Sequence, residues 1–313
     1  MEKIFNPIIF QGNLNRENYF EGWYFKQVHS RSEKTYAFIP GISLNKKEKH
    51  CFIQVIISPS METYYFKFPL ELFNYTENPF KIMIANNTFS KTGIDIDIDD
   101  KNFYIKGKLD YGEFQKIEKS LLVPNIMGYF AYIPKMECNH GVTSMNHSVD
   151  GFLKINDETL IFEEDKGYIE KDWGISFPEK YIWMQGNHFA NTNDSFMCSI
   201  AKIPFLGSSF MGIIANLHFR DAEYRFGTYK RTKLKKLIIE EKEISFNLVN
   251  KDYSLKVKGI VEKSGILKSP RNGEMSQTIK EGLGGIIKLD LFHKGNIYHI
   301  ESNHCGIEIV NMN

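Results

Sequence analysis

The sequence predicts an all-β fold in which one domain occurs twice. Glu21–Gln27 (EGWYFKQ) aligns without a gap with Glu179–Gln185 (EKYIWMQ), and aromatic residues fall on aromatic residues between the shared ends. Three further segments repeat in the same order, namely 101–110 with 251–260, 151–155 with 285–289, and 167–170 with 306–308. Self-similarity at so long a period is typical of a duplicated domain.

Strand signals dominate along the chain. Residues 93–99 alternate isoleucine with aspartate, which puts the apolar side chains on one face of a strand, and 64–68 and 237–248 behave similarly. Turn signals such as Asn156-Asp157 recur at intervals of roughly ten residues, a spacing typical of antiparallel meanders in sandwiches or barrels. Helical periodicity is scarce, and Met275–Leu283 is the one short helix we expect.

The repeat also predicts the domain boundaries. The first domain would span residues 1–174 and the second residues 175–313, since the second copy begins near Phe177-Pro178. The stretch between them lacks the composition of a flexible linker, so the two halves are expected to pack closely.

Composition excludes several functional classes. The 313 residues are 42% hydrophobic with a net charge of +1, which indicates neither nucleic acid nor an anionic membrane as a bulk-charge partner. The four cysteines lack paired spacing and fit a reducing compartment. No secretory signal and no apolar run of membrane-spanning length is visible, so we expect a cytoplasmic protein.

Two strands carry unusual polar residues. On residues 181–189, Tyr181, Trp183, Gln185, Asn187 and Phe189 share one face. Buried amides need hydrogen-bond partners, which a ligand or the opposite wall of a barrel could supply. The first strand places Glu21 beside Trp23, Phe25 and Gln27. Burial would raise the pKa of that carboxyl toward use as a general acid, unless Glu21 is a rim residue in water.

Two further acids and two histidines lie beside these motifs. Glu170 and Asp172 are two residues apart before Trp173, so both could face one way, or form a solvated turn with Lys171. His147 and His188 adjoin the motifs, but no histidine pair has metal-ligand spacing and no nucleotide-binding motif occurs. We therefore expect neither a metal nor a cofactor. The basic run 230–236 reads as a solvated edge strand or turn.

Three motifs together resemble the tocopherol cyclase family: Phe20–Lys26 (FEGWYFK), Tyr168–Gly174 (YIEKDWG) and Trp183–Asn187 (WMQGN). The first two are quite specific, and the resemblance covers nearly the whole chain. It implies two tandem lipocalin-like antiparallel β-barrels with few short helices, related to carotenoid hydratases. The chemistry implied is redox-neutral and needs no cofactor: a prenyl double bond is protonated, and a phenol oxygen attacks the resulting cation.

The resemblance also implies roles for the residues singled out above. Glu21, Glu170 or Asp172 would be the acid; the plant pattern has Asn in place of Asp172, so Glu170 and Glu21 match better. The expected substrate-binding residues are Trp23, Phe25, Trp173, Trp183, Gln185, Asn187, His188 and His147, although the position of His188 is apolar in the plant pattern.

The leading hypothesis is therefore an acid-catalysed cyclase, hydratase or isomerase acting on a hydrophobic, prenylated or polyunsaturated small molecule. The alternative is a non-catalytic carrier of a lipid or pigment, and a third reading is a filled interaction module. The expected partner is a hydrophobic small molecule and not nucleic acid. Transient membrane contact, the substrate and the oligomeric state are left open.

Overall fold

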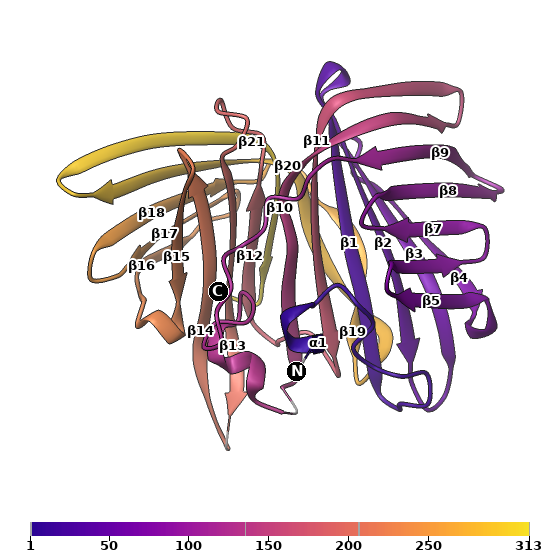
Figure 1. Ribbon diagram of the computed structural model, residues 1–313, viewed down its shortest axis with the longest axis horizontal. Coiled ribbons are helices and arrows are strands. Elements are labelled where there is room, and N and C mark those ends of the chain that lie inside the picture. The colour runs from indigo at the N-terminus through magenta and orange to yellow at the C-terminus, as the bar shows by residue number, and fades with distance from the viewer. Residues whose placement is uncertain (1, 135, 206, 313) are drawn as a thin grey trace.

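Two antiparallel sheets account for most of the chain (Figure 1). The structure is a computed structural model that describes residues 2–134, 136–205 and 207–312. Each sheet curls into a nearly closed barrel, and the two barrels lie side by side. Strands β1, β10, β11, β12, β20 and β21 occupy the middle of the molecule, between the outer walls of the barrels (Figure 1).

The first barrel has eleven strands in the order β4-β3-β2-β1-β11-β10-β9-β8-β7-β6-β5. Its edge strands β4 and β5 follow one another through a short 3-10 turn, η2 (Leu70–Leu72), which is why the sheet curls back on itself. Aromatic and aliphatic side chains on alternate positions fill its interior. The strands are β1 (Tyr19–His29), β2 (Lys34–Leu44), β3 (Lys49–Ser58), β4 (Glu62–Pro69), β5 (Phe73–Glu77), β6 (Phe80–Ile84), β7 (Asn87–Ser90), β8 (Gly93–Asp100), β9 (Phe103–Tyr111), β10 (Cys138–Ile155) and β11 (Glu158–Gly174).

The second barrel repeats this plan with ten strands, in the order β15-β14-β13-β12-β21-β20-β18-β17-β16, and β19 pairs with β20 off this path. Its edge strands β15 and β16 are again joined by a 3-10 turn, η4 (Thr228–Lys230). The strands are β12 (Tyr181–Gly186), β13 (Ser195–Phe205), β14 (Ser208–Phe219), β15 (Ala222–Gly227), β16 (Lys233–Ile239), β17 (Glu243–Val249), β18 (Tyr253–Ile260), β19 (Gly265–Arg271), β20 (Glu274–His293) and β21 (Asn296–Val310).

Helices are few and short, as predicted: α1 (Glu2–Phe5), η1 (Ser30–Ser32) and η3 (Gly128–Tyr132), besides the two turns above. The helix predicted at Met275–Leu283 is wrong, because these residues form the first half of β20. Burial there alternates with period two, since Ile279, Glu281 and Leu283 are buried while Lys280 is exposed. Gly284, with φ +95°, lies at a register shift in the β20–β21 pairing and does not end a helix.

The repeated segments lie on strands that hold the same place in each barrel. The four pairs fall on β1 and β12, β9 and β18, β10 and β20, and β11 and β21. The chain passes from one sheet to the other between Gly174 and Tyr181. That the halves are separate domains, 1–174 and 175–313, stays a prediction.

The gapless alignment has the right strands but is one residue out of register. Tyr24 pairs with Glu170 across β1 and β11, and Trp183 pairs with Glu308 across β12 and β21. Tyr24 is therefore the structural counterpart of Trp183, whereas the alignment had matched Phe25 to Trp183. A slip of one residue moves a side chain to the other face of its sheet. Among the described residues, no helix is long and apolar enough to cross a membrane.

Candidate functional site: a pocket between the barrels

A pocket of about 170 Å³ lies where the two barrels meet, and it opens to solvent on one side. It is lined mainly by apolar and aromatic side chains, together with four carboxylates and one histidine. The apolar lining includes Phe20, Tyr24, Ile39, Phe52, Met127, Phe130, Phe177, Tyr181, Trp183, Ile203, Phe210, Leu267 and Ile279.

The pleat of the central strands decides which side chains reach this pocket. Tyr24 on β1, Glu170 on β11, Trp183 on β12 and Glu281 on β20 all point outward from their own barrel and toward the other. Beside the first three in sequence, Trp23, Phe25, Ile169, Ile182 and Met184 point into the barrel cores. The outward faces of two barrel walls thus form one chamber.

Glu170, Asp172 and His140 form one polar network in the pocket. The Tyr168 hydroxyl and the Trp183 indole both donate to Glu170 Oε2, over 2.5 and 3.0 Å. His140 lies between the two carboxylates, with Nδ1 2.8 Å from Asp172 Oδ1 and Nε2 3.3 Å from Glu170 Oε2. Burial favours a neutral ring, but the charges and hydrogen bonds of Asp172 and Glu170 prevail and raise the pKa of His140 well above its usual value. The two carboxylates therefore favour the imidazolium form of His140.

Glu281 and Glu308 form a second acidic pair, and they face each other across β20 and β21. The Tyr24 hydroxyl donates to Glu281 Oε1 over 2.5 Å, and the Tyr181 hydroxyl donates to Glu308 Oε2 over 2.7 Å. Burial raises the pKa of Glu281 to about 7. Burial, and then the negative charge of Glu281, raises the pKa of Glu308 well above its usual value. Glu281 can therefore carry a proton near neutral pH, and the neutral form of Glu308 is favoured as well.

Unsatisfied polar atoms lie beside this acidic pair. The Lys26 ammonium donates to Gln185 Oε1 over 2.7 Å, and burial lowers the pKa of Lys26 to about 8. Within the described part of the chain, Gln185 Nε2 and Glu281 Oε2 are buried without a hydrogen-bond partner. A ligand hydroxyl or carbonyl would relieve the cost of leaving such groups unpaired.

Of the predicted residues, Glu170, Asp172 and Trp183 line the pocket, whereas Gln185 lies outside the lining and accepts from Lys26. Trp183 packs edge to face on Tyr24, with ring centroids 5.4 Å apart. Such ring faces can stabilise a cation beside them.

Glu21, Trp23, Phe25 and Trp173 lie elsewhere, on the face that packs against the first barrel core. Glu21 forms a fully buried ion pair with Lys171 and accepts from the backbone of Gln11 and Gly12. We therefore do not propose Glu21 as the acid. The alternation in the sequence grouped these residues correctly but did not reveal which side of the sheet faced the pocket.

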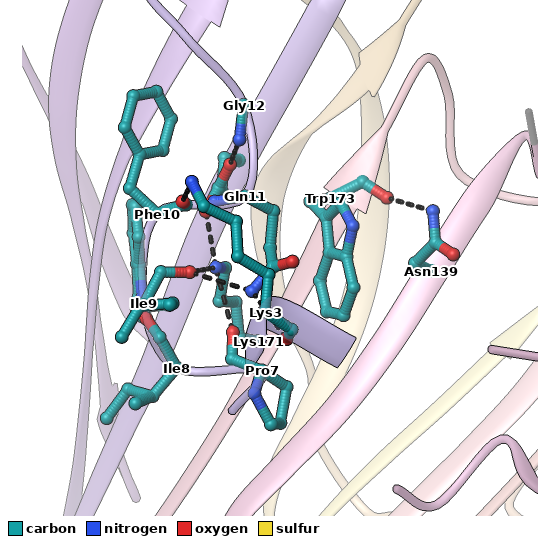
Figure 2. Close-up of polar contacts among 12 residues, drawn as sticks. Lys3, Pro7, Ile8, Ile9, Phe10, Gln11, Gly12, Asn139, Lys171 and Trp173 are labelled. Carbon is teal, nitrogen blue, oxygen red and sulfur yellow. Dashed lines mark hydrogen bonds and ion pairs between the residues drawn. The ribbon is translucent and has the colours of Figure 1, made fainter. Parts of the chain in front are cut away.

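Lys171 organises the N-terminal segment over that face. Figure 2 shows its ammonium among the carbonyls of Pro7 and Ile9, to which it donates over 2.9 and 2.5 Å. The same ammonium lies 4.7 Å from the ring centroid of Trp23 and 5.0 Å from that of Trp173. Glu21, Trp23 and Lys171 thus anchor residues 7–12 to the first barrel.

The remaining predicted residues also lie outside the pocket lining. His147 packs between Tyr111 and Phe114 and contacts Ser144, and burial lowers its pKa to about 3. Asn187 donates to the Gly167 carbonyl over 2.8 Å, so it joins the two barrels instead of facing a ligand. His188 packs its ring on His304, at 5.0 Å between centroids.

Sequence reasoning missed His140, Glu281 and Glu308. A signal existed for Glu308, because the repeat aligned it with Glu170. Glu281 was hidden by the mistaken helix. His140 had no spacing that marked it, because its partners come from a strand thirty residues away.

His140, Glu170 and Asp172 also bring three ligand-type atoms within 4.8 Å of one another. Both imidazole nitrogens, however, already face a carboxylate, and Glu170 Oε2 accepts two further hydrogen bonds. A metal would have to displace these contacts, and we derive no step through one.

Comparisons with known proteins agree with this architecture. A family model described as tocopherol cyclase-like matches residues 99–310, whereas no curated protein matches the chain in sequence. Among solved structures, kievitone hydratase from Nectria haematococca superposes with a TM-score of 0.54 at 11% identity, covering 92% of this chain and 88% of that chain. CghA superposes with a TM-score of 0.60 at 8% identity, covering 93% and 88%. The predicted fold, two tandem lipocalin-like barrels, is confirmed.

Proposed function

The chain belongs to the tocopherol cyclase-like family, and we propose that it catalyses a redox-neutral, acid-catalysed cyclisation, hydration or isomerisation in the pocket between its barrels. The substrate would be a hydrophobic small molecule, prenylated or polyunsaturated, since most of the lining is apolar.

One observation carries this proposal: a carboxyl group with a pKa of about 7, Glu281, is buried in an apolar pocket beside the rings of Tyr24 and Trp183. Protonating a carbon–carbon double bond needs an acid that still holds its proton near neutral pH. It also needs a site that excludes water and stabilises a carbocation. Burial meets the first two needs and the aromatic faces meet the third.

In the proposed reaction, Glu281 transfers its proton to an alkene carbon, and the positive charge develops on the neighbouring carbon. The cation then bonds to a hydroxyl of the substrate, which closes a ring, or to a water molecule, which gives a hydrate. Loss of a proton instead gives an isomer. In each case one proton returns to the carboxylate, so the enzyme is regenerated without any change of oxidation state. Glu308, whose pKa is also raised, would supply or share the proton.

The Lys26 ammonium would complement this acid. Its positive charge lowers the pKa of Glu281 against the effect of burial, so it favours the carboxylate form after proton transfer, whereas the charge of Glu170 acts in the opposite direction. Gln185 Nε2 and Glu281 Oε2 would orient a polar group of the substrate near the reacting double bond.

A carrier remains the second candidate, and the same unpaired donor and acceptor favour it. They would hold a ligand hydroxyl equally well without any reaction. We also propose a cytoplasmic location, because the four cysteines are free.

The test is turnover of a prenylated quinol in D2O by the parent protein and by Glu281→Gln, Glu308→Gln and Glu179→Gln, the last an exposed control. We expect one deuterium in the product at the protonated carbon, and loss of turnover in the first variant. Equal turnover by Glu281→Gln and the control would refute the acid. If a ligand co-purifies with the parent and with every variant, and its mass is the same before and after incubation, the protein is a carrier.

A further inference from the structure

Exposed large apolar side chains lie beside the pocket-lining residues Phe130 and Phe210. We call five of them the apolar rim: Leu121, Leu122, Tyr129, Tyr132 and Phe205. Leu121 and Leu122 are 79% and 75% exposed, the two most exposed large hydrophobic side chains among the described residues. Exposing large apolar side chains to water is unfavourable, and a contiguous patch of them on a protein surface marks an interaction site.

The rim is continuous with the pocket wall. The Tyr132 hydroxyl donates to the Leu121 carbonyl over 2.6 Å, which ties the loop around residues 121–122 to η3. Within η3, Tyr129 packs on Phe130, and Phe130 packs on Phe210 at 5.7 Å between centroids. Phe130 and Phe210 are half-buried and line the pocket. An apolar surface therefore runs from the exposed rim into the chamber.

Positive charge adjoins the rim on one side. The ring centroids of Tyr129 and of Tyr229 in η4 lie 6.3 Å apart. From Tyr229 the chain continues into the basic run 230–236. Residues 228–239 contain five basic side chains and no acidic one, in a chain whose net charge is only +1. Lys230, Arg231 and Lys233 are exposed. This asymmetry is local and does not follow from the overall composition.

These features favour a lipid bilayer over a protein as the occupant. Leucine, tyrosine and phenylalanine at the tip of a basic surface are typical of proteins that insert side chains among anionic headgroups. The rim also opens into an apolar chamber, so a ligand dissolved in a bilayer could enter without crossing water. A protein partner would explain the rim but not its continuity with the pocket.

We propose that the apolar rim and the basic run 230–236 form a docking surface for an anionic lipid bilayer, oriented with the pocket mouth against the membrane. Docking uses neither Glu281 nor any chemical step, so it stands or falls separately from the proposed reaction.

The test is co-sedimentation with vesicles of phosphatidylcholine alone and of phosphatidylcholine mixed with phosphatidylserine. We expect the parent protein to bind the mixed vesicles on the order of tenfold more tightly. The double variant Leu121→Ser/Leu122→Ser should lose binding to both. Lys230→Glu/Lys233→Glu should lose the preference for phosphatidylserine. Glu281→Gln should bind as the parent does.

Matched controls lie on the outer wall of the first barrel. Phe152→Ser/Ile161→Ser removes two other exposed apolar side chains, 45% and 48% exposed, and Lys101→Glu/Lys154→Glu makes the same change of charge. Both should bind vesicles normally, and thermal melting checks that all variants are folded. Absence of parental binding, or equal losses in rim and control variants, would overturn the proposal. So would a rim variant that changes the oligomeric state, since the rim would then join two copies of the chain.

Discussion

Tyr24 and Trp183 pack edge to face across the boundary between the barrels, and each donates a hydrogen bond to a carboxylate of the other barrel. Tyr24 belongs to the first barrel and donates to Glu281 of the second, while Trp183 belongs to the second and donates to Glu170 of the first. The strand pairing makes the two aromatic residues structural counterparts. Duplication has thus produced an approximately reciprocal arrangement in which each half supports an acid of the other.

Glu281→Gln should abolish most activity, because the amide cannot supply a proton. A positioned general acid typically contributes about 10²–10⁴-fold, and we expect kcat to fall by that amount while substrate binding persists. Steady-state kinetics beside Glu179→Gln as control would measure the loss. A loss of kcat/KM that comes only from a raised KM, with kcat unchanged, would contradict the assignment.

The same substitution should stabilise the fold above neutral pH. The pKa of Glu281 is raised from 4.5 to about 7, so the folded state binds more protons than the unfolded chain between those values. The free energy of unfolding therefore decreases as pH rises through that window. Glu281→Gln removes this dependence, and urea unfolding at pH 8 should show it more stable than the parent by about 1 to 3 kcal/mol. A variant less stable than the parent at pH 8 would contradict the raised pKa.

Tyr24→Phe should extend activity to higher pH. The hydrogen bond from Tyr24 lowers the pKa of Glu281 against the larger effect of burial, so removing the hydroxyl allows that pKa to rise. The alkaline limb of the pH–kcat profile should move to higher pH, while the phenylalanine ring still packs on Trp183. An unchanged limb would mean that Glu281 does not set the profile.

Much of this arrangement was accessible from the sequence, and the part that was not has a physical reason. Alternation of apolar and polar residues identified the strands, the order of the repeats identified the duplicated domain, and the resemblance to the tocopherol cyclase family supplied the barrel fold. Alternation tells which residues share a face but not whether that face lines a barrel or looks outward. Trp23 and Trp183 were therefore placed in one site, although a one-residue offset puts them on opposite sides of equivalent strands.

The acids illustrate the same limit. Glu170 and Asp172 were found because they lie close together in sequence, whereas Glu281 acquires its environment from Tyr24, which is 257 residues away. Contacts between barrels depend on how two closed sheets dock, and no local pattern encodes that. Glu21 and Lys171, which come from two of the motifs that carry the resemblance, proved to anchor the N-terminal segment.

His140→Gln should destabilise the fold in a pH-dependent manner. Asp172 and Glu170 raise the pKa of His140, so its contribution is fully present below the ordinary histidine value and is lost as pH rises through the raised one. The difference in unfolding free energy between parent and variant should thus shrink toward alkaline pH. Urea titrations at several pH values would measure it, with His299→Gln, a largely exposed histidine paired to Asp290, as control. A difference that stays constant with pH would show that the imidazolium is not what the network stabilises.

Lys171→Met should be among the most destabilising single changes in the first barrel. The ammonium neutralises Glu21 at a site where both side chains are fully buried, and it also donates to the Pro7 and Ile9 carbonyls. Removing one partner of a buried pair leaves an uncompensated charge, which typically costs about 3–5 kcal/mol.

The matched control is Lys106→Met, which breaks an exposed pair with Asp97 and should cost less than about 1 kcal/mol. Lys171→Met should also release residues 7–12, so trypsin should cleave after Arg16 faster than in the parent. Thermal melting and limited proteolysis measure the two effects. If Lys171→Met has the same melting temperature as Lys106→Met and resists trypsin as the parent does, the ion pair does not hold the N-terminal segment in place.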